Sequence, residues 1–101
     1  MDRSTNGKSL NDNLLVGPTI QNDLFSILVR FRMQPIVPAA DITKMYRQVN
    51  MNEDDQAFQL IIWHNSEDED LKIFKLKTVT YGIPSAPFLA IRCLHELACK
   101  Y

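Results

Sequence analysis

The 101-residue chain contains few cysteines and glycines, and it has no long apolar run. Its two cysteines, Cys93 and Cys99, are too few for a disulfide framework and indicate free thiols in a reducing compartment. The start of the chain lacks the apolar core of a signal peptide, and no apolar run approaches the length of a membrane span. These absences predict a soluble, intracellular protein without a membrane partner, cytoplasmic by default and with access to the nucleus left open.

Concentrated positive charge is also missing. The formal net charge is −1, with six Lys and Arg against four Asp and Glu in residues 1–50 and five against eight in residues 51–101. A free-standing nucleic-acid binder gains most of its affinity by neutralising phosphates, so the chain is predicted to hold a template and primer poorly by itself. No nucleotide-binding glycine loop or nucleophile elbow is present.

The composition is that of a folded chain, with 46% hydrophobic and 23% charged residues. At 101 residues it forms one small domain at most, with a core that stabilises it only marginally. Residues 1–13 are polar and are predicted to be a flexible lead-in, whereas residues 14–101 carry the patterned segments. The predicted fold class is α+β, because both helical and alternating patterns occur.

Two main helices are expected. Apolar residues at helical spacing predict one from about Thr19 to Arg32, with Pro18 or Thr19 at its start. A second helix is predicted from Ser85 or Ala86 to Tyr101.

The strands are expected between these helices. Residues 35–40 read as a short strand that Pro38 interrupts. Residues 58–63 and 71–79 are rich in β-branched and aromatic residues and predict a β-hairpin around a polar loop. Residues 43–49 read as a loop or a short helical turn, and the acidic run 53–55 as a solvated helix start or turn.

Asp41 is the residue whose position most needs an explanation. It follows an apolar stretch, so it is expected at the end of a buried strand, where ionisation costs free energy unless a cation or donor lies opposite. One interpretation is a helix N-cap, although the Glu or Gln of a capping box is missing three residues later. The other is a metal ligand, and the residues alone leave both open.

Three blocks of sequence occur together in one order. They are Asn6–Asp12 with Leu14–Gln21, then Ala40–Gln48, then Thr78–Gly82 with Ser85–Ala90. The second block resembles the first catalytic motif of retroelement reverse transcriptases, most closely the form of the BEL/Pao group of long-terminal-repeat retrotransposons. The others resemble the segment before that motif and the second conserved block of the same group. The resemblance implies a partial fingers and palm region in residues 14–101.

The resemblance also implies roles for individual residues. Asp41 matches the catalytic aspartate that binds Mg²⁺ in a two-metal site, and the Ile42 carbonyl would be a second oxygen near the metal. Tyr46 matches the aromatic residue that crowds the sugar 2′ position and selects deoxynucleotides. Tyr81 would lie beside the nucleotide pocket, and Gly82 would let the backbone pass close to the base pair. A half-buried core tyrosine at 46 and a structural turn at 81–82 are the alternatives.

Four basic residues are weaker candidates for contact with nucleic acid. Arg30 and Arg32 fall in the last turn of the predicted helix, where the helix dipole alone favours cations. Arg47 would meet a phosphate or face water. Lys72 lies on the outer side of the predicted hairpin, where attraction to the acidic loop explains it equally well.

The third catalytic block of the family, usually Tyr-x-Asp-Asp, does not occur in these 101 residues. The intact parent would be an RNA-directed DNA polymerase that uses Mg²⁺, an RNA or DNA template-primer and deoxynucleotides, whereas this chain is predicted to be inactive alone. The alternative function is a domesticated or decayed, non-catalytic interaction module. Apolar faces left uncovered would favour self-association of the fragment or its degradation.

A zinc site has little support in the sequence. Cys93, His95 and Cys99 fall on one predicted helix, with His95 and Cys99 on one face and Cys93 pointing elsewhere. No CxxC pair accompanies them.

Overall fold

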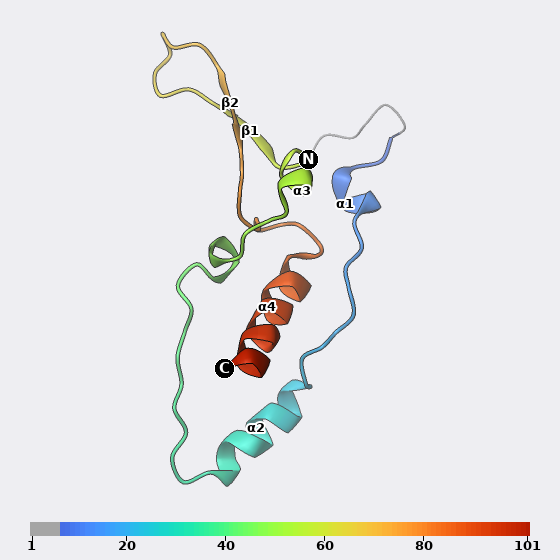
Figure 1. Cartoon of the computed structure of the whole chain (residues 1–101), viewed down its shortest axis with the longest axis vertical. Coiled ribbons are helices and arrows are strands. Elements are labelled where there is room, and N and C mark those ends of the chain that lie inside the picture. The colour runs from blue at the N-terminus through green and yellow to red at the C-terminus, as the bar shows by residue number, and fades with distance from the viewer. Residues whose placement is uncertain (1–6) are drawn as a thin grey trace.

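The computed structural model describes residues 7–101, which form an open arrangement of short elements (Figure 1). Helices and a two-stranded antiparallel sheet occur together, so the predicted α+β class is confirmed. In chain order the elements are α1 (Leu10–Asn13), α2 (Leu24–Met33), the 3-10 helix η1 (Met45–Gln48), α3 (Glu53–Gln56), β1 (Leu60–Trp63), β2 (Lys72–Lys75) and α4 (Ala86–Lys100).

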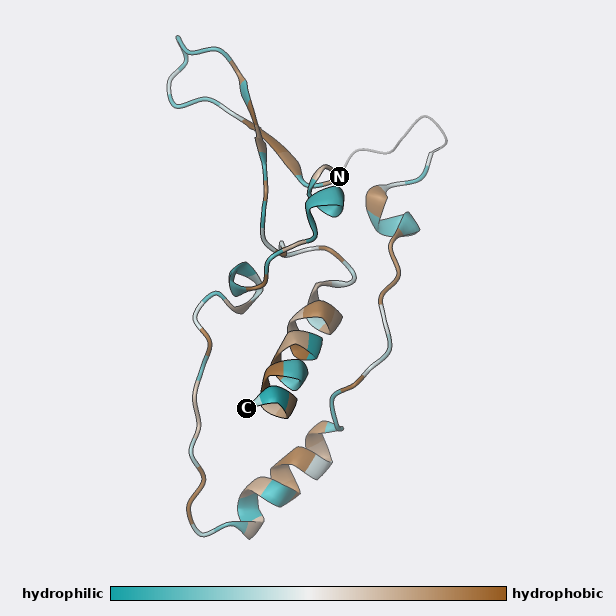
Figure 2. Ribbon diagram, in the orientation of Figure 1, coloured by the Kyte–Doolittle hydropathy of each residue, from teal (hydrophilic) through white to brown (hydrophobic). Residues whose placement is uncertain are grey.

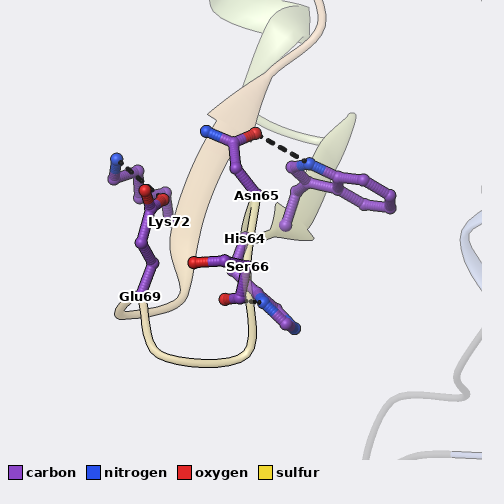
Figure 3. A network of polar contacts seen from close by, with 6 residues as sticks. His64, Asn65, Ser66, Glu69 and Lys72 are labelled. Carbon is purple, nitrogen blue, oxygen red and sulfur yellow. Dashed lines mark hydrogen bonds and ion pairs between the residues drawn. The ribbon is translucent and has the colours of Figure 1, made fainter.

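The predicted β-hairpin is confirmed, with strands shorter than expected. β1 pairs with β2 in an antiparallel register that sets Leu60 opposite Lys75 and Trp63 opposite Lys72. The loop is held by local polar contacts (Figure 3). His64 Nδ1 lies 2.5 Å from the Ser66 carbonyl oxygen, and Lys72 Nζ lies 3.7 Å from Glu69 Oε2. The acidic loop therefore does attract Lys72.

The small core lies where the chain enters α4. Val79, Ile83 and Ala86 are buried there. Partly buried apolar side chains pack against them: Leu14, Tyr46, Val49, Met51 and Leu89. The core thus joins the 46–51 segment to the turn before α4, and α4 also contacts η1.

Two backbone hydrogen bonds fix this junction. The Met51 N–H donates to the Lys77 carbonyl at 2.9 Å, and the Val79 N–H donates to the Val49 carbonyl at 2.9 Å. Asn50 and Thr78 form an isolated antiparallel bridge between them. The chain that follows β2 is therefore joined by one isolated bridge to the segment before α3.

Much apolar surface stays uncovered. The accessible surface is 8979 Å², whereas a folded monomer of this mass is expected to expose about 5,800 Å². The radius of gyration is 18.3 Å, against about 13 Å for a compact domain of this length. Every residue of β1 and β2 is exposed, and α2 buries none of its residues. Figure 2 shows hydrophobic stretches along these exposed elements.

The prediction for the first helix is right about its existence and wrong about its start. α2 begins at Leu24, because the Asp23 carboxylate accepts a hydrogen bond from the Ser26 N–H at 2.7 Å and acts as the N-cap. Residues 18–23 are not helical. The last turn holds Arg30 and Arg32, as predicted.

The predicted strand at residues 35–40 is wrong, because this segment has no regular structure. Pro35 and Pro38 lack N–H donors, and no strand within residues 7–101 lies beside the segment to pair with its other backbone groups. The predicted short helical turn at 43–49 is confirmed by η1, and the acidic helix start at 53–55 by α3. The C-terminal helix is confirmed as α4, with Ser85 as its N-cap residue.

Residues 1–6 of the predicted lead-in lie outside the described residues. Within residues 7–13 the chain forms α1, and a capping box stabilises its N-terminus. The Ser9 hydroxyl accepts a hydrogen bond from the Asp12 N–H, and the Asp12 carboxylate accepts one from the Ser9 N–H at 2.8 Å. Across residues 7–101, the structure has no helix with the length and apolarity needed to cross a membrane.

Candidate functional site

Asp41 lies in the irregular segment between α2 and η1, and it is exposed. The expected position at the end of a buried strand is therefore wrong. The N-cap interpretation is wrong too, since the N-cap residue of η1 is Lys44, with φ 51° and ψ 47°. Within residues 7–101, no hydrogen bond or ion pair occupies the Asp41 carboxylate. Its oxygens are open to solvent and to any ligand.

Tyr46 and Tyr81 meet, although they come from different sequence blocks. Their ring centroids are 4.9 Å apart and their planes cross at 61°, an edge-to-face arrangement. Tyr46 is half-buried against Val79 and its neighbours, whereas Tyr81 is 56% exposed. The half-buried core position foreseen as the alternative for Tyr46 is thus observed, and its ring still borders the exposed Tyr81.

The contact is positioned by the backbone around it. η1 presents Tyr46, and the chain that follows it is tied by the Val49 and Met51 hydrogen bonds to residues 77–79. Tyr81 follows two residues after the buried Val79. The backbone pairing of residues 49–51 with residues 77–79 therefore brings Tyr46 and Tyr81 close together.

Gly82 adopts φ +85°, a left-handed conformation that strains any residue with a Cβ. A Cβ built there would meet nothing within 4 Å. Its carbonyl accepts a hydrogen bond from Asn11 Nδ2 at 3.1 Å. The turn alone accounts for this glycine. Asn11 is a residue that the sequence could not reveal, because its partner is distant in the chain.

A groove of about 800 Å³ runs between α4 and the segment from Ile42 to Asn50. Ile42, Met45 and Val49 line one side, and Ala90 and Leu97 line the other. Neither Asp41 nor the two tyrosines belong to its lining. Ile42 therefore faces a different space from the Tyr46–Tyr81 pair.

The four basic candidates do not gather into one patch. Arg30 and Arg32 lie on α2, Arg47 lies on η1, and Lys72 lies on β2. α2 and the hairpin stand at opposite ends of the long axis (Figure 1). Lys72 pairs with Glu69 in the hairpin loop, where both side chains are about half exposed.

Metal ligands are sparse in the described part of the chain. Residues 7–101 hold no group of three or more His, Cys, Asp or Glu side chains placed to bind one ion. Asp41 offers Mg²⁺ an exposed carboxylate, but it belongs to no such group within residues 7–101. A two-metal site would need further carboxylates from other segments.

Comparison with known proteins adds no relative: no family model, no curated protein and no solved structure matches this chain.

Proposed function

We propose that the chain is part of the fingers and palm of a BEL/Pao-type reverse transcriptase, an RNA-directed DNA polymerase. The proposal is supported by three sequence blocks in one order over nearly the whole chain. The observation that carries it is the Tyr46–Tyr81 contact, because the family resemblance assigns both tyrosines to one nucleotide pocket and their rings lie 4.9 Å apart.

In this proposal Asp41 is one of the carboxylates that bind Mg²⁺, with the Ile42 carbonyl nearby. Magnesium supplies activation of the primer hydroxyl and stabilisation of the leaving pyrophosphate. The exposure of Asp41 supports such a role, since a carboxylate with no partner in residues 7–101 is free to coordinate a cation. Tyr46 would select deoxynucleotides, and Tyr81 and Gly82 would form the edge of the pocket.

The template-primer would have to be held largely by other segments. Arg30, Arg32, Arg47 and Lys72 lie on separate elements, and the net charge of the chain is −1. The further carboxylates that a two-metal site needs would likewise have to come from other segments. The intact parent is therefore the polymerase, and the 101 residues alone are proposed to be inactive.

The test is to read the transcript through the codon for Tyr101 and to assay the encoded protein for primer extension. A frame that continues into Tyr-x-Asp-Asp, with extension reduced roughly a hundredfold or more by Asp41→Asn, supports the proposal. Asp54→Asn is the control, because Asp54 is exposed on α3 and belongs to no motif. Equal activity of the Asp41→Asn variant and the native protein would contradict it.

A non-catalytic interaction module is the second candidate, and a different observation favours it. Large apolar side chains are exposed on the hairpin and on α2, including Trp63 at 60% and Phe25 at 78%. Exposed apolar side chains on these two separate elements are available for contact with another protein or another copy of the chain. A stop directly after Tyr101, together with a stable folded product of 101 residues, would favour this candidate over the polymerase.

A further inference from the structure

His95 and Cys99 bring two metal-binding atoms together on α4. The distance between His95 Nδ1 and Cys99 Sγ is 3.7 Å, and both side chains are exposed. Zinc binds sulfur at about 2.3 Å and imidazole nitrogen at about 2.0–2.1 Å, so a tetrahedral site sets these two donors about 3.6 Å apart. The pair already has the spacing of a zinc chelate.

We propose that His95 and Cys99 form half of a zinc site, and that the same two residues of a second copy of this chain supply the other half. Structural zinc sites are closed by four protein ligands, commonly two Cys and two His. Residues 7–101 provide no third ligand beside the pair. A two-fold axis through the ion supplies the missing two donors with the same geometry.

The helix sets the spacing of this half-site. Residues four apart lie on one face of an α-helix, and α4 runs from Ala86 to Lys100. Cys93 lies two residues before His95, about 200° away around the helix, so it cannot join the same ion. It is exposed as well, which makes it a matched control on the same helix.

The charge and the surface both suit a second copy. Two Cys99 thiolates neutralise Zn²⁺, and the nearby Arg92 and Glu96 neutralise each other in an ion pair. The chain exposes about 3,000 Å² more than a folded monomer of its mass, whereas a stable dimer needs about 800 Å² from each partner. On α4 itself, Leu94 and Leu97 are exposed beside the pair, at 39% and 54%.

Zinc binding has a defined proton balance. The ion binds thiolate and neutral imidazole, so each Cys99 thiol gives its proton to the buffer when the ion binds. No electron is transferred. Zinc binding therefore releases protons, and this release is measurable by titration in buffers of different ionisation enthalpy.

The experiment titrates the full, reduced 101-residue chain with zinc chloride by calorimetry and follows its mass by sedimentation. We expect one ion bound per two chains and a zinc-dependent dimer. Co²⁺ in place of zinc should give a sulfur-to-metal charge-transfer band. Cys99→Ser should abolish the band, and both this variant and His95→Gln should weaken binding at least about tenfold, whereas Cys93→Ser should change neither.

Four results would overturn the proposal. They are absence of zinc binding, one ion per monomeric chain, unchanged binding in Cys99→Ser, and an equal loss in Cys93→Ser. Circular dichroism of each variant without metal keeps the test valid, because exposed substitutions should leave the α4 helix intact. The outcome is independent of polymerase activity, since neither residue belongs to the blocks that support the reverse-transcriptase proposal.

Discussion

The edge of one tyrosine ring meets the face of another between Tyr46 and Tyr81, with centroids 4.9 Å apart. This contact joins the 3-10 helix η1 to the turn before α4, two parts of the chain that the core cluster around Val79 also holds together. It is therefore both a structural contact and the meeting point of the two sequence blocks that we propose to form a nucleotide pocket.

The coupling between these rings can be measured by a double-mutant cycle. Tyr46→Ala and Tyr81→Ala, alone and together, should show a coupling of about 0.5–1.5 kcal/mol in the free energy of unfolding, since aromatic pairs contribute this much beyond their buried area. Urea unfolding measures it. A cycle of Tyr46→Ala with Tyr101→Ala is the control, because Tyr101 is 92% exposed and should show no coupling. Full additivity of the Tyr46 and Tyr81 substitutions would contradict the contact.

Val79 should be the most sensitive point of the core. It is the one large side chain of the described residues that is completely buried. Val79→Ala removes two buried methyl groups and should lower the free energy of unfolding by about 2 kcal/mol. Val16→Ala makes the same chemical change at a residue that is 64% exposed, and it should cost less than about 0.5 kcal/mol. Equal midpoints of the two variants in urea would show that Val79 is not buried in solution.

The elements with strong local signals were predictable from the sequence. The β-hairpin follows from β-branched and aromatic residues around an acidic loop, and α4 follows from helical spacing after the turn at Pro84. The start of α2 was missed because apolar spacing extends back to Ile20, whereas the cap is formed by Asp23 with Ser26. The periodic pattern outweighed a capping signal that lay inside it.

The site was harder to predict, because its geometry depends on distant contacts. The strand expected before Asp41 needed a partner strand, which residues 7–101 do not place beside it, and Pro35 and Pro38 weaken it further. The Tyr46–Tyr81 contact could be expected only from the family resemblance. The hydrogen bond from Asn11 to Gly82 had no signal in the sequence at all.

Substituting Gly17 and Gly82 by Ala separates two effects, the backbone strain of a positive φ and the steric clash of a new Cβ. Both have positive φ, +83° and +85°, so Ala at either position should cost roughly 1–2 kcal/mol in backbone strain. At Gly17 a new Cβ would also lie 2.5 Å from Phe88 Cγ and 2.9 Å from Phe88 Cβ, whereas at Gly82 it meets nothing. Gly17→Ala should therefore destabilise the chain more than Gly82→Ala in thermal unfolding. The reverse order would contradict the packing of Phe88 against this segment.

The N-cap of α2 should respond to pH through Asp23. Hydrogen bonds from the Ser26 N–H and then the Ser26 hydroxyl hold the pKa of the Asp23 carboxyl below its usual value of 3.8. A pKa lowered by folding means that the charged form favours the folded helix. The stabilisation is therefore fully present above pH 3.8 and is lost as the pH falls through the lower value of the folded chain.

Asp12 complicates a global measurement, because hydrogen bonds from Ser9 lower the pKa of its carboxyl as well. The NMR resonance of the Ser26 amide avoids this problem, since it reports on the start of α2 alone. In the native chain, we expect the Ser26 amide shift to titrate below pH 3.8 while α2 loses helicity. In Asp23→Asn, the amide oxygen still accepts the hydrogen bond but does not ionise, so the Ser26 shift should stay constant over that range. An unchanged titration of Ser26 in Asp23→Asn would show that another group controls the start of α2.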